Sequence, residues 1–141
     1  MGPVVGYVPG VFDLFHVGHL NALRVAADLC DVLVAGVVSD EVCEAVKGLR
    51  PFVPLAERLE IVDAIGIVDA VYAETTTDKA DAWRAVGFHR LFKGDDWQHT
   101  PKGDALLEQM RALGAEVVWF PYTLTTSSTA LRSVIDGAVA G

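Results

Sequence analysis

The sequence predicts a single α/β domain with a doubly wound, five-stranded parallel sheet, and three observations support this prediction. Short apolar runs alternate along the chain with segments of helical periodicity, which is typical of a parallel sheet covered by helices on both faces. The 141 residues suit one domain with one core. Apolar residues make up 52% of them, which is typical of a globular chain. We therefore expect residues 1–141 to form one domain.

Five apolar runs are predicted to be the strands. In chain order they are Val4–Val8, Val32–Val38, Val68–Ala73, Arg90–Lys93 and Glu116–Phe120. Val32–Val38 is almost entirely apolar and rich in valine, which is typical of a strand buried on both faces of a sheet. Because helical segments separate the runs, we expect the strands to be parallel and joined by right-handed crossovers.

Helical periodicity and glycine stops predict the helices between the strands. They cover residues 17–29, 40–46, 55–65, 78–86 and 103–113, and a last helix begins near Ser127. The first of them places Val17, Leu20 and Leu23 on one face, whereas Gly87 and Gly114 end two of the others. The longer segments between these elements are predicted to be loops: Lys47–Pro54, Gly94–Lys102 and Pro121–Thr126.

Charge and composition exclude several classes of function. A net charge of −8 at pH 7 argues against a nucleic-acid partner but not against a nucleotide, which needs only a local cluster of cations and amides. The longest apolar run, Val32–Val38, is too short to span a bilayer, and the N-terminus shows no signal peptide. Cys30 and Cys43 lack metal-ligand spacing and are expected to be buried thiols. We therefore expect a cytoplasmic protein without a membrane partner.

Two histidines follow the first predicted strand, at the edge where parallel sheets bind ligands. His16-Val17-Gly18-His19 begins a predicted helix, so both imidazoles lie on one side. Gly18 lets a ligand approach the backbone, and the free N–H groups of a first helical turn bind anions. The motif therefore favours phosphate binding over proton transfer. Taken alone, it also fits two surface histidines or a loose metal pair, but zinc needs a third ligand, and His89 and His99 show no suitable spacing.

Three segments resemble one enzyme family. Gly10-Val11-Phe12-Asp13 followed by His16-Val17-Gly18-His19 is similar to the G-x-F-D-x-x-H-x-G-H signature of the cytidylyltransferase-like nucleotidyltransferases. Lys93-Gly94-Asp95-Asp96-Trp97 resembles the G-D-D-W segment of bacterial glycerol-3-phosphate cytidylyltransferases. Thr126-Ser127-Ser128-Thr129 resembles the I-S-T-T segment that opens the family's last helix. The resemblance extends from about Val4 to Ile135 and implies a Rossmann-like fold.

The resemblance implies that a nucleoside monophosphate passes from an NTP to a phosphate-bearing small molecule, with release of pyrophosphate. His16 and His19 would stabilise the transition-state α-phosphate. Ser127 and Ser128 would hold the β- and γ-phosphates, although serines there also fit a plain helix N-cap. Mg²⁺ is expected with the nucleotide and zinc is not, because the sequence has no tetrahedral Cys/His set. The G-D-D-W segment predicts CTP rather than ATP.

The resemblance also assigns the other site residues. Lys47 is implied as a catalytic, phosphate-binding residue, although most loop lysines are simply solvated. Nucleotide contacts are implied for Gly10, Val11, Phe12, Gly18, Arg58, Gly94, Asp95, Trp97 and Thr126, and acceptor contacts for Asp13 and Arg50. Arg58 fits equally a surface arginine paired with Glu57 or Glu60, and Trp97 fits equally the core.

The chain departs from the glycerol-phosphate enzymes at two positions. Tyr122 and Leu124-Thr125 replace Arg and Glu-Gly in their R-T-E-G-I-S-T-T segment, and Gly66 replaces a frequent arginine. Two expected cations are therefore missing, and tyrosine can hydrogen-bond but cannot neutralise charge. Lys47–Pro54 resembles instead the loops of heptose-phosphate adenylyltransferases or ethanolamine-phosphate cytidylyltransferases.

Glycerol 3-phosphate is the predicted acceptor, and other functions stay open. One is an adenylyltransferase for a sugar phosphate, and another is a cytidylyltransferase for ethanolamine phosphate or a phosphonate. A third, of another class, is a nucleotide-binding module without catalysis. The family resemblance further implies a homodimer.

Overall fold

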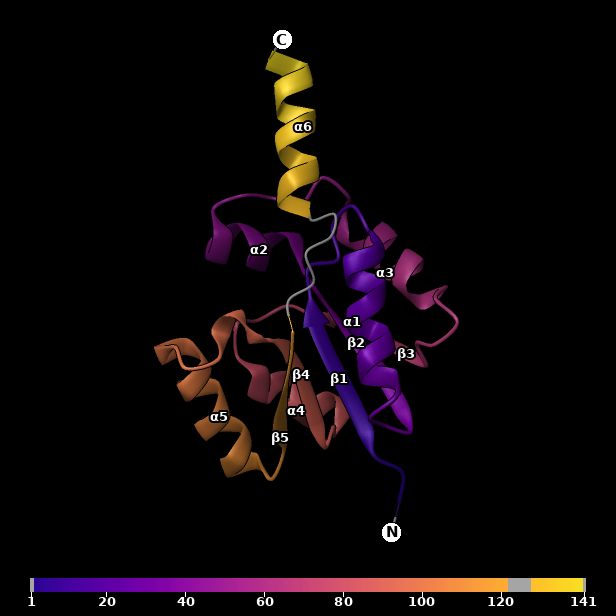
Figure 1. Ribbon diagram of the computed structural model, residues 1–141, viewed down its shortest axis with the longest axis vertical. Helices are drawn as coiled ribbons and strands as arrows, with labels where there is room; N and C mark the ends of the chain where they lie inside the picture. The colour runs from indigo at the N-terminus through magenta and orange to yellow at the C-terminus, as the bar shows by residue number, and fades with distance from the viewer. Residues whose placement is uncertain (1, 122–127, 141) are drawn as a thin grey trace.

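The computed structural model describes residues 2–121 and 128–140. Five parallel strands form one sheet in the order β3-β2-β1-β4-β5, which confirms the predicted doubly wound α/β class. The strands are β1 (Val5–Gly10), β2 (Val32–Val38), β3 (Ala70–Glu74), β4 (Arg90–Gly94) and β5 (Glu116–Phe120). The helices are α1 (Val17–Ala27), α2 (Asp40–Lys47), α3 (Leu55–Asp63), α4 (Lys79–Val86), α5 (Pro101–Leu113) and α6 (Ser128–Ala140) (Figure 1).

The strand order reverses beside β1, the central strand. The chain runs from β1 to β2 and β3 and then crosses back to β4 on the other side of β1. β1 pairs with β2 along its whole length, but it pairs with β4 only at Gly6 and Tyr7. β1 and β4 therefore separate toward their carboxyl ends, which is where open α/β sheets bind ligands.

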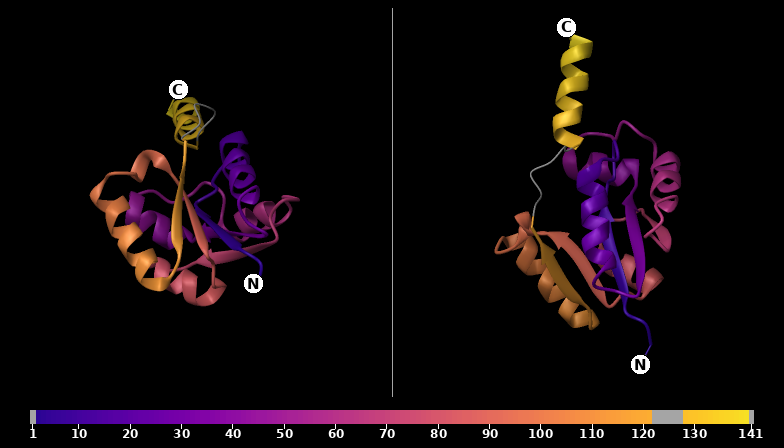
Figure 2. Two further views of the ribbon diagram at one scale, coloured as in Figure 1. Left: turned by 60° about the horizontal axis from the view of Figure 1, so that its bottom comes forward. Right: turned by 45° about the vertical axis from the view of Figure 1, so that its right-hand side comes forward.

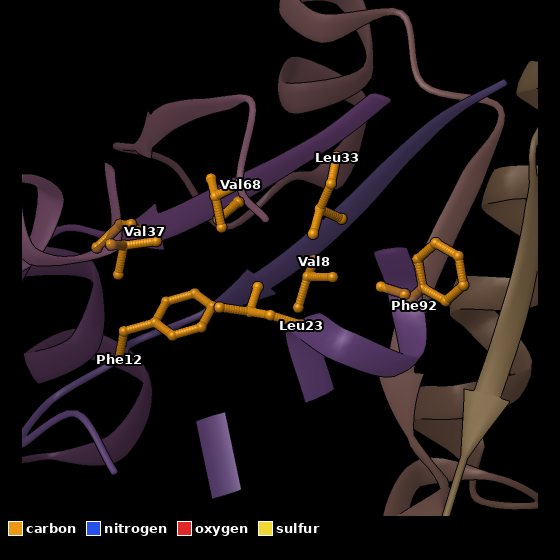
Figure 3. Packing of buried hydrophobic residues seen from close by; sticks show 10 residues of the cluster. Val8, Phe12, Leu23, Leu33, Val37, Val68 and Phe92 are labelled. Atoms are coloured by element: carbon orange, nitrogen blue, oxygen red, sulfur yellow. The ribbon is translucent and has the colours of Figure 1, made fainter. Parts of the chain in front are cut away.

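Each face of the sheet carries its own apolar core, because consecutive strand residues point to opposite faces. One core joins the sheet to α1 and α3 and includes Val8, Leu23, Leu33, Val37, Val62 and Phe92 (Figure 3). The other joins it to α4 and α5 and includes Tyr7, Val34, Ala82, Leu91, Leu106 and Met110. Figure 2 shows the two helical layers on either side of the strands.

Several element boundaries differ from the prediction by a few residues. β1 extends to Gly10, and β3 begins at Ala70 instead of Val68. α5 begins at Pro101, two residues early, because the Thr100 hydroxyl caps it by accepting a hydrogen bond from the backbone N–H of Gly103. The preceding predicted loop contains a short 3₁₀ helix, η1 (Asp95–Trp97).

The last helix, α6, stands out from the body of the domain, and its first turn lies at the end where β1 terminates (Figure 1). The residues just before it, 122–127, lie outside the described part, so the predicted start at Ser127 is not described. Across residues 2–121 and 128–140 no helix has the length and apolar character that a membrane span requires.

Candidate active site

The loop between β1 and α1 holds two residues in the left-handed region of backbone conformation. Phe12 has a φ of 55° and Leu14 a φ of 52°, and such a conformation costs a non-glycine residue roughly 1–3 kcal/mol. Between them, Asp13 is turned inward, and its carboxylate accepts hydrogen bonds from the backbone N–H groups of Phe52 (2.9 Å) and Val53 (3.0 Å). Strain of this kind clusters at functional sites, and here the hydrogen bonds of Asp13 hold the strained segment that leads into the two histidines.

His16 and His19 form a stacked pair at the start of α1, with ring centroids 3.9 Å apart. His16 is the N-cap residue, and its Nδ1 accepts a hydrogen bond from the backbone N–H of Gly18 at 3.0 Å. The backbone N–H of His16 donates in turn to Nδ1 of His19 at 3.2 Å. Because both Nδ1 atoms act as acceptors, each neutral ring carries its proton on Nε2. The pair therefore presents two Nε2–H donors.

The surroundings of the pair keep both imidazoles neutral at pH 7. Burial lowers the pKa of His19 to about 4. The neighbouring His16 and Lys47 contribute to this shift, and the Asp13 carboxylate opposes it. Burial also lowers the pKa of His16. Two neutral rings that share one orientation can donate hydrogen bonds to an anion, and their low pKa makes protonation during turnover at neutral pH unfavourable.

The lowered pKa of His19 makes the folding stability depend on pH. The unfolded chain protonates this ring as the pH falls through about 6.5, whereas the folded chain does so only near pH 4. The unfolded state thus binds more protons in this window, and the free energy of unfolding falls as the pH falls, by about 2–3 kcal/mol from this ring. His19→Asn retains an acceptor near Nδ1 but does not titrate. Urea unfolding at pH 7 and pH 4.5 should therefore show a smaller loss for His19→Asn than for the wild type, and equal losses would contradict the prediction.

A cleft of about 730 Å³, here called the histidine cleft, opens between the separating ends of β1 and β4. Most of the predicted site residues line it: Gly10, Val11, Phe12, Asp13, His16, Gly18, His19, Lys47, Gly94, Trp97 and Ser128. Thr126 and Ser127, which were predicted to bind phosphate, lie outside the described residues. The structure thus brings the segments of all three sequence motifs to one cleft.

Ser128, the first described residue of α6, reaches the histidine pair. Its hydroxyl donates to the backbone carbonyl of Asp13 at 2.5 Å and lies 3.4 Å from Nε2 of His16. The first turns of α1 and α6 therefore meet across the cleft. Backbone N–H groups at helix N-termini bind anions, so the two helix ends and the two Nε2–H donors together suit a phosphate chain.

Arg132 is a site residue that the sequence analysis missed. It lies one turn after Ser128 on α6 and lines the histidine cleft. Its guanidinium lies 3.6 Å from the Asp13 carboxylate, donates to the backbone carbonyl of Arg50 at 2.8 Å and stacks over the ring of Phe52. The i, i+4 spacing from Ser128 was the available signal. Arg132 therefore supplies a cation to the cleft.

Lys93, at the end of β4, is a second missed residue of the cleft. Its ammonium group lies 4.2 Å from the centroid of the half-buried Trp97 ring, which also packs against the core that contains Leu106 and Met110. Burial lowers the pKa of Lys93, and repulsion from the charges of Lys79 and Lys47 lowers it further. The attraction of Asp96 acts in the opposite direction. The position of Lys93 at a strand end, just before the G-D-D-W segment, was the available signal.

The alternative that Arg58 is a surface arginine is wrong, and the structure does not bring Arg58 into the cleft, so its nucleotide contact stays a prediction. Arg58 belongs to α3, is fully buried and lines neither the histidine cleft nor the neighbouring cavity. Its guanidinium donates to the backbone carbonyls of Val53, Val11 and Val38 and to the carboxylate of Asp40. These contacts join α3 to the ends of β1 and β2, so Arg58 holds in place the backbone that carries the site.

The acceptor contacts of Asp13 and Arg50 stay predictions, and the structure gives both side chains contacts within the protein. Both carboxylate oxygens of Asp13 are engaged by the loop that contains Phe52, so Asp13 positions this loop. Arg50 is half-exposed, does not line the cleft, and pairs with Glu44 at 2.9 Å and with Glu41 at 3.6 Å.

Asp95 does not line the histidine cleft; its neighbour Asp96 does. Both belong to η1, whose tight turn points the two consecutive side chains in different directions. The sequence motif therefore identified a segment that lines the cleft, and the nucleotide contact of Asp95 stays a prediction.

Comparison with known proteins agrees with this geometry. The family model described as cytidylyltransferase-like matches residues 7–134, which is most of the chain. The chain belongs to the cytidylyltransferase-like family. It is a nucleotidyltransferase domain of this family, as the motifs predicted.

Relatives within the cytidylyltransferase-like family carry different names. An FAD synthase of Thermococcus kodakarensis is 33% identical over 94% of this chain and 89% of its own length. A bifunctional protein HldE of Hyphomonas neptunium is 33% identical over 92% of this chain, and an ethanolamine-phosphate cytidylyltransferase of Arabidopsis thaliana is 51% identical over 51% of it. The chain spans only 26% and 17% of the lengths of the latter two proteins.

A solved structure shares the cytidylyltransferase-like fold. The lipopolysaccharide core biosynthesis protein from Thermoplasma volcanium superposes with a TM-score of 0.75 over 89% of this chain and 100% of its own chain, at 22% identity. At this identity the likeness shows the fold alone, and it supports the five-stranded, doubly wound architecture.

Proposed function

We propose that this nucleotidyltransferase domain transfers CMP from CTP to a small molecule that bears a phosphate or phosphonate group, with release of pyrophosphate. The observation that supports the proposal best is the orientation of the two histidines. Both Nδ1 atoms accept hydrogen bonds from backbone N–H groups, so both rings carry Nε2–H donors at the cleft, where Nε2 of His16 already lies 3.4 Å from the hydroxyl of Ser128.

The proposed reaction is an in-line displacement at the α-phosphorus of the nucleotide. An acceptor oxygen forms the new P–O bond, the bond between the α-phosphorus and its bridging oxygen breaks, and pyrophosphate leaves with the bonding electrons. Negative charge on the α-phosphate oxygens is stabilised by the donors of His16 and His19. In this proposal the β- and γ-phosphates are held by Ser128, the N-terminus of α6 and Arg132, and its support is that both side chains line the cleft.

Mg²⁺ with the nucleotide is part of the proposal. Magnesium keeps several waters and binds through substrate phosphates and one or two carboxylates, and Asp96 offers a carboxylate at the edge of the cleft. When bound, the ion neutralises phosphate charge. Among the described residues no three His, Cys, Asp or Glu side chains gather as metal ligands, so the residues fit an ion that arrives with the nucleotide better than a metal held by the protein alone.

Pyrophosphate release with a panel of substrates tests the proposal. CTP and ATP are each combined with glycerol 3-phosphate, the reference acceptor from the motif resemblance, and with ethanolamine phosphate, a sugar phosphate, FMN and 2-hydroxyethylphosphonate. We expect Mg²⁺-dependent release that is faster with CTP. Equal or faster release with ATP would contradict the choice of base, and stoichiometric zinc required for activity would contradict the metal.

A binding module without catalysis is the second candidate, because the two family arginines at positions 122 and 66 are absent. This candidate predicts nucleotide binding by calorimetry and no pyrophosphate from any pair in the panel. The homodimer stays a prediction, which light scattering of the purified chain measures.

A further inference from the structure

A second cavity, of about 620 Å³, adjoins the histidine cleft at the carboxyl ends of β2, β3 and β4. It shares Gly10, Val11, Lys47, Lys93 and Trp97 with the cleft, so the two spaces adjoin at these residues. Its other walls come from α2, the first turn of α4 and the first turns of α5. A ligand in this cavity would lie beside the α-phosphate of a nucleotide in the cleft, which is the place that the proposed function requires for the acceptor.

The chain contains four lysines, and all four line this cavity: Lys47, Lys79, Lys93 and Lys102. We therefore call it the lysine cavity. The chain as a whole has a net charge of −8. Among the described residues that line the cavity, Glu74 is the one carboxylate. Four cations against one anion give the cavity a charge opposite in sign to that of the protein, and clefts lined by one sign of charge concentrate ligands of the other sign.

Glu74 is already engaged and positions one of the lysines. Its side chain is 3% exposed, accepts a hydrogen bond from the hydroxyl of Tyr7 and pairs with Lys79 at 2.5 Å. Gly36 leaves room for this arrangement, because a Cβ there would overlap the Tyr7 hydroxyl. The carboxylate therefore fixes the ammonium group of Lys79 at the wall of the cavity, where two of its three N–H donors remain for a ligand.

The lysines divide into two pairs by position. Lys47 and Lys93 line both the cleft and the lysine cavity, so they lie where the attacking phosphate meets the nucleotide. Lys79 and Lys102 line the lysine cavity alone. Lys79 is the first residue of α4 and Lys102 the second of α5. A cation at a helix N-terminus opposes the helix dipole, so neither position is explained by helix stability.

We infer that the lysine cavity selects an acceptor with a second anionic group in addition to the phosphate or phosphonate that attacks. The inference rests on the proposed function, which needs only one anionic group at the α-phosphorus. Lys47 and Lys93 meet that group, and Lys79 and Lys102 meet the second one. Between the charged groups, apolar walls that include Val38, Val42 and Leu106 suit a short carbon skeleton. The acceptor is then a phosphorylated or phosphonylated acid and not a neutral polyol phosphate.

Two matched pairs of acceptors test the inference. 3-Phosphoglycerate differs from glycerol 3-phosphate by a carboxylate in place of a hydroxymethyl group, and O-phosphoserine differs from ethanolamine phosphate by an added carboxylate. Charge-assisted hydrogen bonds should raise kcat/KM for the acid member of a pair by about tenfold or more. Binding of all four compounds is also measured by calorimetry in the presence of a non-hydrolysable CTP analogue, and the acid members should bind more tightly.

The variant Lys102→Gln tests whether the preference for the acid member of each acceptor pair arises in the lysine cavity. It should reduce the ratio of the two kcat/KM values, and the ratio of the two affinities, within each pair. Arg111→Gln is the matched control, because it removes the same charge from the exposed side of α5, outside both spaces. In Arg111→Gln the ratios of kcat/KM and of affinity should be unchanged. If these ratios fall equally in both variants, the preference arises from the electrostatic field of the whole protein, and the inference is overturned.

The outcomes separate the inference from the proposed function. Turnover of both members of each pair at equal efficiency overturns the inference and leaves the function intact. Tighter binding of the acid members without pyrophosphate release overturns the function and supports the inference. Absence of selective binding in both pairs overturns the inference.

Discussion

Replacement of His16 or His19 by alanine is expected to lower kcat by about 10²–10³, or roughly 3–4 kcal/mol, with a small change in KM for the nucleotide. The reason is the geometry of the pair. Each ring is held by a backbone N–H group at Nδ1 and directs Nε2–H outward, so its donor is oriented before the substrate arrives. A donor that meets charge developing at the α-phosphate stabilises the transition state more than the bound substrate, and its loss appears in kcat.

Two amide variants separate this role from a structural one. His19→Gln places an amide nitrogen near the position of Nε2, whereas His19→Asn replaces only the Nδ1 side of the ring. The donor model predicts more residual kcat in His19→Gln than in His19→Asn. Steady-state kinetics are measured with thermal melting of each variant, because a purely structural histidine would lose activity and stability in parallel. Alanine variants that fold and keep kcat within a few-fold of the wild type would refute the assigned chemistry.

Lys47 provides a contrast within the same experiment. It is exposed at the end of α2 and lines the cleft on a flexible four-carbon stem. A lysine on a phosphate contributes to ground-state binding, so Lys47→Ala should raise KM for the nucleotide, unlike the histidine variants.

The sheet and the histidine motif could be predicted from the sequence because their signals are local. A run such as Val32–Val38 is apolar throughout since β2 is buried on both faces, and the two histidines stand three residues apart on one helical turn. The crossover rule then orders the strands with few alternatives. Boundaries were less accurate because caps such as the Thr100 hydroxyl shift a helix start by a residue or two.

The cations of the site could not be sorted from the sequence because their roles depend on distant partners. Arg58 contacts groups 5, 18, 20 and 47 residues away, and nothing near it in sequence distinguishes it from a surface arginine. Nothing in the sequence around Lys79 distinguishes it from other lysines at helix starts, because its partner Glu74 comes from the end of β3. Arg132 lines the cleft because α6 begins near the end of β1, which the sequence does not reveal. Local pattern therefore predicted the donors of the motif and missed the charges around it.

Arg58→Met is expected to destabilise the fold by about 3–5 kcal/mol, the usual loss when one partner of a buried charge pair is removed. Arg58 is fully buried, and its guanidinium donates to three backbone carbonyls at 2.6–2.7 Å and to Asp40 at 2.5 Å. Methionine preserves much of the volume but none of the donors. Three carbonyl groups and a carboxylate are then left without these partners, and unpaired buried polar groups cost free energy even when the space is filled.

Arg84→Met is the matched control. Arg84 also lies on a helix and pairs with a carboxylate, Asp81, at 2.8 Å, but its side chain is 63% exposed. Its loss should change the free energy of unfolding by less than about 1 kcal/mol. Urea unfolding of the wild type and both variants measures the difference, and equal losses would contradict the assigned role of Arg58. Because two of the carbonyls belong to Val11 and Val38, at the ends of β1 and β2, the folded fraction of Arg58→Met should also bind CTP more weakly than Arg84→Met does.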